Sequence, residues 1–258
     1  MNKLRDEGLP TTTVAVGFDE RPDLLGPWLA MPHAWPEFIL HTRPPRVRVQ
    51  DVRAMFPQLK RFWIDADAVV VAHIHAVALQ WDAKVATLPT TWNEIVERAV
   101  EQRHQGVRPN TLCALGAEVR VGHHRRGLGT AMLKDLKQIG RKLGLGHFIA
   151  PARPTAKASA LNASMASFAA RLRADGLPQD PWLRCHVRGG AHIVGIMEAA
   201  LVVEGSVAQW RQWTGLPLAQ DGETTVPGAL NHVCVDLRGG RCRYVEDAVW
   251  VHQVLRAN

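Results

Sequence analysis

The alternation of apolar and polar positions is clearest in the middle of the chain. Residues 111–121 are mostly apolar, which predicts a β-strand, and apolar residues then recur every three or four positions over 132–143, which predicts an amphipathic helix. Gly144 stands where a helix C-cap is expected. The basic residues of this segment are expected on the opposite face of the helix: Lys134, Lys137, Arg141 and Lys142.

A basic glycine loop, residues 124–130, joins this strand to this helix. Its glycines let a ligand approach the backbone, and the first turn of the helix offers N–H groups that have no intrahelical partner. The helix dipole and the adjacent Arg125 and Arg126 favour negative charge. The loop therefore predicts a pyrophosphate site, and the alternative is an ordinary tight turn with solvated arginines. The sequence lacks the Walker motif, and its glycine spacing does not fit a dinucleotide fold.

The rest of the chain predicts further helices and strands. A hairpin is expected from 62–65 and 69–79 around a polar turn, and Thr91 with Glu94 forms a capping box that opens a helix to about residue 103. Other expected elements are short helices within 18–41 and 51–59, a bulge at Gly116, a strand at 147–150, a helix over 156–173, a helix capped by Asp180 and ended by Gly189 and Gly190, a strand at 193–196, a helix after Ser206, and a hairpin of 227–236 with 241–254.

Composition indicates a globular protein. The 258 residues are 47% hydrophobic and 21% charged, and no apolar run is as long as a membrane span requires. The polar start of the chain lacks a signal-peptide core, and the four cysteines are scattered, so a cytoplasmic location is expected. We expect one elaborated domain with a core of about 60–200, a helical lead-in over 1–59 and a C-terminal extension over 204–258.

A net charge of +7 raises the question of nucleic-acid binding. The basic residues are spread along the chain, and no known nucleic-acid-binding motif is present. The densest basic stretch is already explained by the phosphate loop and its helix. Nucleic acid is therefore not expected as a partner.

The strand, loop and helix around residues 124–130 resemble the acetyl-CoA-binding segment of the GNAT acyltransferase superfamily. The family loop reads Gln/Arg-x-x-Gly-x-Gly/Ala, and here His124 takes the first position, followed by Gly127 and Gly129. His124 departs from the family pattern, and Val121 replaces a frequent proline. By this resemblance the coenzyme contacts fall on Val119, Val121, His124, Arg125, Arg126, Gly127, Leu128, Gly129 and Thr130.

A second segment resembles the family as well. Residues 180–190 match a short helix that ends in Tyr-x-x-x-Gly-Phe, and alignment on Gly190 places His186 in the tyrosine position. In many members that tyrosine protonates the departing thiolate, so the resemblance makes His186 a candidate acid, with a packing histidine as the alternative. The resemblance also implies an α/β (α+β) fold, with a mixed, mostly antiparallel sheet that is splayed at the acyl-CoA cleft and flanked by helices.

The amine that attacks a thioester must be neutral, so a base is needed. Glu118 and His75 are the candidates for the catalytic site, with His73 and Asp82 as further choices that the sequence does not separate. His73 and His75 share one face of their strand, where they either line the cleft or belong to the core. Although there are 12 histidines, no metal-ligand spacing is complete, so no metal is expected.

The sequence thus predicts a GNAT-fold N-acyltransferase that uses acetyl-CoA, or another acyl-CoA, to acylate an amine of a small molecule. One alternative keeps the coenzyme site but changes the chemistry to decarboxylation or acyl loading onto a carrier thiol. Others are a non-catalytic coenzyme A-binding protein and a basic nucleic-acid-binding module. The sequence does not decide whether the protein forms a homodimer.

Overall fold

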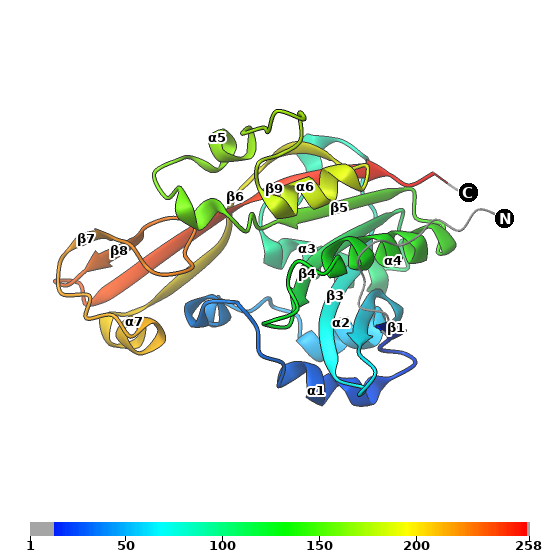
Figure 1. Ribbon diagram of the computed structural model, residues 1–258, viewed down its shortest axis with the longest axis horizontal. Helices are drawn as coiled ribbons and strands as arrows, with labels where there is room; N and C mark the ends of the chain where they lie inside the picture. Colours follow the sequence, from blue (N-terminus) through cyan, green and yellow to red (C-terminus); the bar gives the residue numbers. More distant parts are fainter. Residues whose placement is uncertain (1–12, 257–258) are drawn as a thin grey trace.

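The computed structural model describes residues 13–256, whose strands form one sheet (Figure 1). The strand order is β1-β2-β3-β4-β5-β9-β8-β7, and β6 (His192–Ser206) also pairs with β9 (Arg241–Val254). All pairings are antiparallel except that of β4 (Thr111–Val119) with β5 (His147–Ala152). The expected mixed, mostly antiparallel sheet flanked by helices is confirmed.

The N-terminal part contains the expected helices and hairpin. Its elements are β1 (Val14–Gly17), η1 (Pro22–Leu24), α1 (Leu25–Leu29), η2 (Glu37–His41), α2 (Val49–Met55), η3 (Pro57–Leu59), β2 (Lys60–Ile64), β3 (Val70–Leu79), η4 (Val85–Thr87) and α3 (Trp92–His104). The side chain of Thr91 accepts the N–H of Glu94, as the capping box predicts. The lead-in that was expected to be helical also contains β1, which is too short for periodicity to reveal and pairs with β2. The start of the chain, to which the signal-peptide prediction refers, lies outside the described residues.

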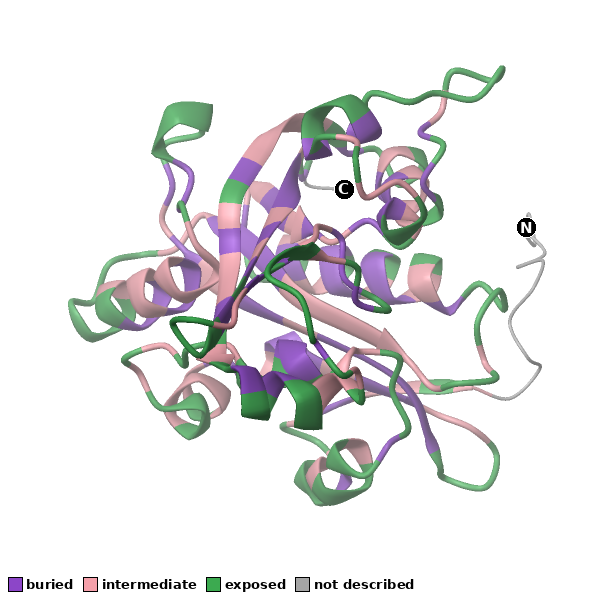
Figure 2. Cartoon of the chain, turned by 90° about the vertical axis from the view of Figure 1, so that its left-hand side faces the viewer, coloured by how far each residue is buried: buried purple, intermediate pink, exposed green. Residues whose placement is uncertain are grey.

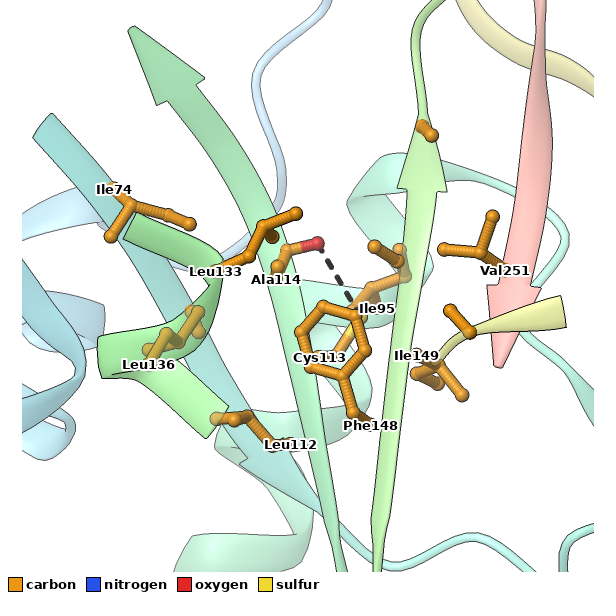
Figure 3. Packing of buried hydrophobic residues seen from close by; sticks show 14 of the residues in the cluster. Ile74, Ile95, Leu112, Cys113, Ala114, Leu133, Leu136, Phe148, Ile149 and Val251 are labelled. Carbon is orange, nitrogen blue, oxygen red and sulfur yellow. Dashed lines mark hydrogen bonds between the residues drawn. The ribbon is translucent and has the colours of Figure 1, made fainter. Parts of the chain in front are cut away.

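Strands β4 and β5 pair over a short stretch and then separate (Figure 3). Their register contains only Thr111 with His147, Leu112 with Phe148, and Cys113 with Ile149. Just beyond this stretch β4 carries the expected bulge: Ala114 lies opposite Ala76 and Gly116 opposite His75, so Leu115 is the extra residue. The predicted splay is therefore confirmed, and it leaves one edge of β4 unpaired with β5 after Cys113.

Helix α4 (Leu128–Lys142) follows the glycine loop as predicted. Gly127 caps it with a φ of 76°, and Gly144 beyond its C-terminal end has a φ of 72°. Its apolar face covers the sheet, with Leu133 and Leu136 turned towards β4 (Figure 3). Lys137 is wrongly predicted to be solvated, because α6 (Pro181–Arg188) covers it and leaves it 4% exposed.

The expected helix over 156–173 is wrong. The segment holds only the turn η5 (Lys157–Ser159) and the short helix α5 (Met165–Ala169). Lys157 is completely buried, and its ammonium donates to the carbonyls of Ala160, Leu161 and Leu230 at 3.1, 3.3 and 2.7 Å. Two of these carbonyls therefore point to the lysine rather than along a helix, and helix formation restarts only at Ser164, whose side chain caps α5.

The C-terminal part projects as an arm built on the long strands β6 and β9 (Figure 1). It also contains α7 (Val207–Thr214), β7 (Gly222–Thr224) and β8 (Val233–Asp236), and the predicted hairpin of β8 with β9 is confirmed. The strand expected at 193–196 is part of the longer β6. Since β9 also pairs with β5, the region expected as an extension supplies a strand inside the sheet.

Buried residues concentrate in the strands and on the helix faces turned towards them, whereas the connecting loops are mostly exposed (Figure 2). The main cluster lies between the sheet and helices α3 and α4. A second cluster fills the arm, where Phe38 stacks on Trp210 and contacts Tyr244 by its edge. Within residues 13–256 no helix is long and apolar enough to cross a bilayer.

Candidate functional site

The loop between β4 and α4 forms a cradle of backbone amides. None of the hydrogen bonds within the described part of the chain uses the N–H groups of residues 124–130. Arg125 and Gly127 both adopt positive φ, at 62° and 76°, a backbone conformation that occurs in the amide nests that bind anions. The start of α4 adds the positive end of its dipole. These groups fit the pyrophosphate of an acyl-CoA.

Most of the residues assigned to the coenzyme lie at or near this cradle. His124, Arg125 and Arg126 are exposed, so their side chains are free to meet phosphate. Val119 ends β4. The N–H of Val121 donates to the carbonyl of Pro32 at 3.3 Å, and that of His123 to the carbonyl of Arg120 at 2.9 Å, so these two amides are already paired.

Gly129 and Thr130 meet helix α6. A Cβ on Gly129 would lie 3.1 Å from the Trp182 ring, so glycine allows α6 to approach the first turn of α4. The hydroxyl of Thr130 lies 3.3 Å from the sulfur of Cys185. Leu128 is buried and anchors the helix start in the core. Gly129 thus serves helix packing as well as the amide cradle.

On the other face of the sheet, Glu118 lies in the separated part of β4. Its carboxylate accepts the indole N–H of Trp28 at 2.9 Å, from a residue of α1. Glu118 is half-buried and pairs across the strands with His73. His73 is fully buried, and its ring lies 4.4 Å from that of Trp28. This geometry places a carboxylate beside the free edge of β4.

The other candidate bases differ in their surroundings. The ring of His75 contacts the backbone at Gly116, where a Cβ would approach it to 2.7 Å, and burial lowers the pKa of His75 to about 3. Asp82 is exposed in the turn after β3, where it accepts the N–H of Lys84 at 3.1 Å. Leu79, the last residue of β3 before this turn, pairs with Thr111 at the start of β4, so the structure does not bring Asp82 to Glu118.

Lys60 completes a cluster on this face that the sequence analysis missed. Its ammonium lies 2.8 Å from Nε2 of His73 and 3.6 Å from the centre of the Trp28 ring. Burial, and then the charge of Arg53, lower its pKa to about 7, while Glu118 acts in the opposite direction. The sequence could have indicated that Lys60 is buried. Lys60 and the buried Phe62 are two residues apart in one strand, so their side chains point to the same face of the sheet.

His186 lies on the α4 side of the sheet. It is 1% exposed, and neither ring nitrogen has a hydrogen-bond partner among residues 13–256. Its ring is 6.1 Å from Phe148 and 4.6 Å from Trp182, and burial, followed by the charge of Lys137, lowers its pKa to about 3. His186 is therefore neutral near pH 7. A neutral imidazole can form hydrogen bonds, but it is not the protonated imidazolium that acts as a general acid.

Lys137 is a second buried group on the α4 side of the sheet, and the sequence analysis did not identify it as part of the site. Its ammonium donates to the carbonyl of Gly189 at 3.1 Å and lies 4.7 Å from the Phe148 ring. Burial lowers the pKa of Lys137 to about 8. Its position, one residue after Leu136 and four after Leu133, falls inside the apolar stripe of α4, which is the signal that could have revealed it. No group of three His, Cys, Asp or Glu side chains within residues 13–256 has a metal-binding arrangement.

These buried bases make stability depend on pH. Between pH 3 and 6.5 the unfolded chain binds protons that His75 and His186 do not bind in the folded state, so stability falls on acidification. Between pH 7 and 10.5 the unfolded chain keeps a proton that folded Lys60 has lost, so stability rises with pH. Burial raises the pKa of Cys113, which offsets part of this rise above about pH 9.

We therefore expect the free energy of unfolding to rise by about 2 kcal/mol from pH 7 to pH 9 through Lys60, and to fall below pH 6. Urea titrations across this range measure it. A Lys60→Met variant is the control, since its stability should rise less over the same interval. A maximum at or below pH 7 in the unaltered protein would contradict the expectation.

Comparison with known proteins supports the fold. None of the known protein-family models matches the sequence. The chain is 28% identical over 180 residues to the arginine N-acetyltransferase avaD of Aspergillus versicolor, an alignment that covers 62% of this chain and 62% of that protein. The match thus spans less than two thirds of either chain.

Two solved structures share the architecture over nearly the whole chain. The loading GNATL domain of CurA from Lyngbya majuscula has a TM-score of 0.59 and 16% identity, with 94% of this chain and 98% of that one covered. The GphF GNAT-like decarboxylase in complex with isobutyryl-CoA has a TM-score of 0.57 and 16% identity, with 95% and 99% covered. At this identity the likeness is one of fold. The splayed sheet, the glycine loop that opens α4 and these likenesses together show that the chain has the fold of the GNAT acyltransferases.

Proposed function

We propose that the chain is an acyl-CoA-dependent N-acyltransferase that transfers an acetyl group from acetyl-CoA to the amine of a small molecule by direct attack. The observation that carries the proposal is the amide cradle of residues 124–130 beside the strand edge that β4 exposes where it leaves β5. A cradle that holds pyrophosphate there directs the acyl end of the coenzyme into the opening between the two strands. The relative named as an arginine N-acetyltransferase supports an amine as the acceptor.

The residues divide between the two faces of the opening. Arg125 and Arg126 pair with phosphate, and the free N–H groups of β4 polarise the thioester carbonyl. Glu118, on the α1 side, accepts the proton that the acceptor ammonium must lose, directly or through water. His75 is the alternative base, although its low pKa makes it a weak one. His186, on the α4 side, is a neutral hydrogen-bonding group for the departing sulfur.

The basic loop and the cysteines bear on the partners and the location of the protein. A phosphate-bearing coenzyme at the cradle accounts for the densest basic stretch, so the proposal includes no nucleic-acid partner. Each of the four cysteines is a free thiol: Cys113, Cys185, Cys234 and Cys242. Free thiols support a reducing compartment, and we propose the cytoplasm.

Calorimetric titration with acetyl-CoA tests the coenzyme, with NADH and a short DNA duplex as controls. Release of free thiol from acetyl-CoA in the presence of a panel of amines, including amino acids and polyamines, then tests the reaction. Micromolar binding of acetyl-CoA alone, followed by amine-dependent thiol release, is the expected result. Thiol release without an amine would replace the proposal by altered acyl chemistry, and absence of acetyl-CoA binding would overturn it.

A further inference from the structure

Lys60 is a buried ammonium without a carboxylate partner. It is 5% exposed, and no ion pair of the described residues includes it. Its contacts are Nε2 of His73 at 2.8 Å, the Trp28 ring at 3.6 Å and the Phe62 ring at 5.5 Å. A charge removed from water in this way costs stability, so its place among side chains that lead to Glu118 on β4 points to a role in the site rather than in folding.

The contacts of Lys60 lead to Glu118 through one side chain. The face of the Trp28 indole receives the lysine ammonium, and the N–H at the edge of the same ring donates to Glu118 at 2.9 Å. A cation over an indole draws electron density from the ring and strengthens its N–H as a donor. The indole is thus held between a cation on its face and an anion at its edge.

His73 fixes the other side of this arrangement. Its ring lies against Trp28, at 4.4 Å, and it stands opposite Glu118 in the register of β3 and β4. The ring of His75 follows at 5.1 Å from that of His73. Lys60 Nζ and His73 Nε2 are 2.8 Å apart, a distance that requires a proton between the two nitrogens. This hydrogen bond holds the Lys60 amine in place over the Trp28 indole.

We propose that Lys60 is a positioning residue of the acceptor site, which acts on Glu118 through the indole of Trp28. The proposal rests on the proposed function, since it takes Glu118 as the group that receives the proton of the acceptor. In this arrangement the charge of Lys60 holds Trp28 in place and Trp28 aims the Glu118 carboxylate at the opening. Lys60 itself touches neither substrate.

The arrangement should respond to pH through Lys60. The titratable and charged groups that face its amine are His73 and His75 of β3, Glu118 of β4 and Arg53 of α2. Both histidines are neutral near pH 7, because burial lowers their pKa values, His73 well below the ordinary value and His75 to about 3. Loss of the Lys60 proton near pH 7 is therefore the event that changes the Trp28 contact.

A double-mutant cycle separates this role from a structural one. Lys60→Met is expected to lower kcat for amine acylation by about tenfold or more, with KM for acetyl-CoA unchanged, because the coenzyme binds elsewhere. In a Glu118→Gln background the same substitution should cost nothing further, since its effect passes through Glu118. Lys84→Met, which removes a lysine whose side chain is 76% exposed, is the matched control and should leave kcat unchanged. Equal losses in both backgrounds would overturn the proposal.

A second measurement needs neither activity nor a Lys60 variant. The indole N–H resonance of Trp28, assigned by its loss in Trp28→Phe, should shift between pH 6 and 8 in the unaltered protein and move again in Glu118→Gln. A resonance that stays constant over this range would overturn the proposal. If the unaltered protein acylates no amine, the proposed function fails, and the resonance still decides whether Lys60 is coupled to Glu118.

Discussion

Gly129→Asp is expected to weaken acetyl-CoA binding at least about 100-fold. The substitution places a carboxylate beside the N–H groups of residues 124–130, where the pyrophosphate is proposed to lie, and like charges at about 4 Å repel by several kcal/mol at a protein surface. It also adds a Cβ that would approach the Trp182 ring to 3.1 Å. Calorimetric titration with acetyl-CoA measures the loss.

Two variants separate charge from packing. Gly129→Ala adds only the Cβ, so it should disturb the contact of α4 with α6 and reduce affinity far less. Gly146→Asp is the matched control, because a Cβ there meets no atom within 4 Å, and it should bind as the unaltered protein does. Unchanged affinity in Gly129→Asp would remove the glycine loop from the coenzyme site.

Glu246→Leu is expected to lower the free energy of unfolding by about 3 to 5 kcal/mol. Glu246 is 2% exposed and accepts two hydrogen bonds from Arg153, at 2.7 and 2.9 Å, and one from the hydroxyl of Tyr244. Leucine has similar bulk but leaves the guanidinium and the hydroxyl without their partner. The same guanidinium also donates to the carbonyl of Gly228, so the loop before β8 should loosen as well.

Chemical denaturation monitored by tryptophan fluorescence measures this loss. Glu204→Leu is the matched control on the same pair of strands. Its carboxylate meets Arg243 at 3.2 Å, but the two side chains are 69% and 56% exposed, so an effect within about 1 kcal/mol is expected. Equal effects of the two substitutions would show that burial does not set the strength of the Glu246 network.

Local sequence signals predicted the parts of the site that lie close together in the chain. The glycine loop and α4 were predictable because the turn residues, the helix start and the apolar period all fall within about 30 residues and agree with one another. The same holds for α6, where Asp180 caps the helix through the N–H groups of Trp182 and Leu183. The splay of β4 from β5 was predicted from the family resemblance and is confirmed by the short register.

Contacts between distant segments could not be predicted in this way. Trp28 and Glu118 are 90 positions apart, and nothing in either neighbourhood indicates that α1 lies over β4. The helix expected over 156–173 failed for the same reason, because Leu230 supplies one of the three carbonyls that hold Lys157. Lys137 was placed in solvent because its burial depends on α6, which packs onto α4 only in the folded chain.

The place of β9 in the sheet bears on how the protein is made. β9 is synthesised after every other described strand, yet it pairs with β5 on one side and β6 on the other. While the chain emerges from the ribosome, β5 therefore has no partner beyond its three-residue pairing with β4, and the edge of β6 stays open. These pairings with β9 can be completed only after residue 254 has left the exit tunnel, so both edges are open to pairing with other chains until synthesis has passed that point.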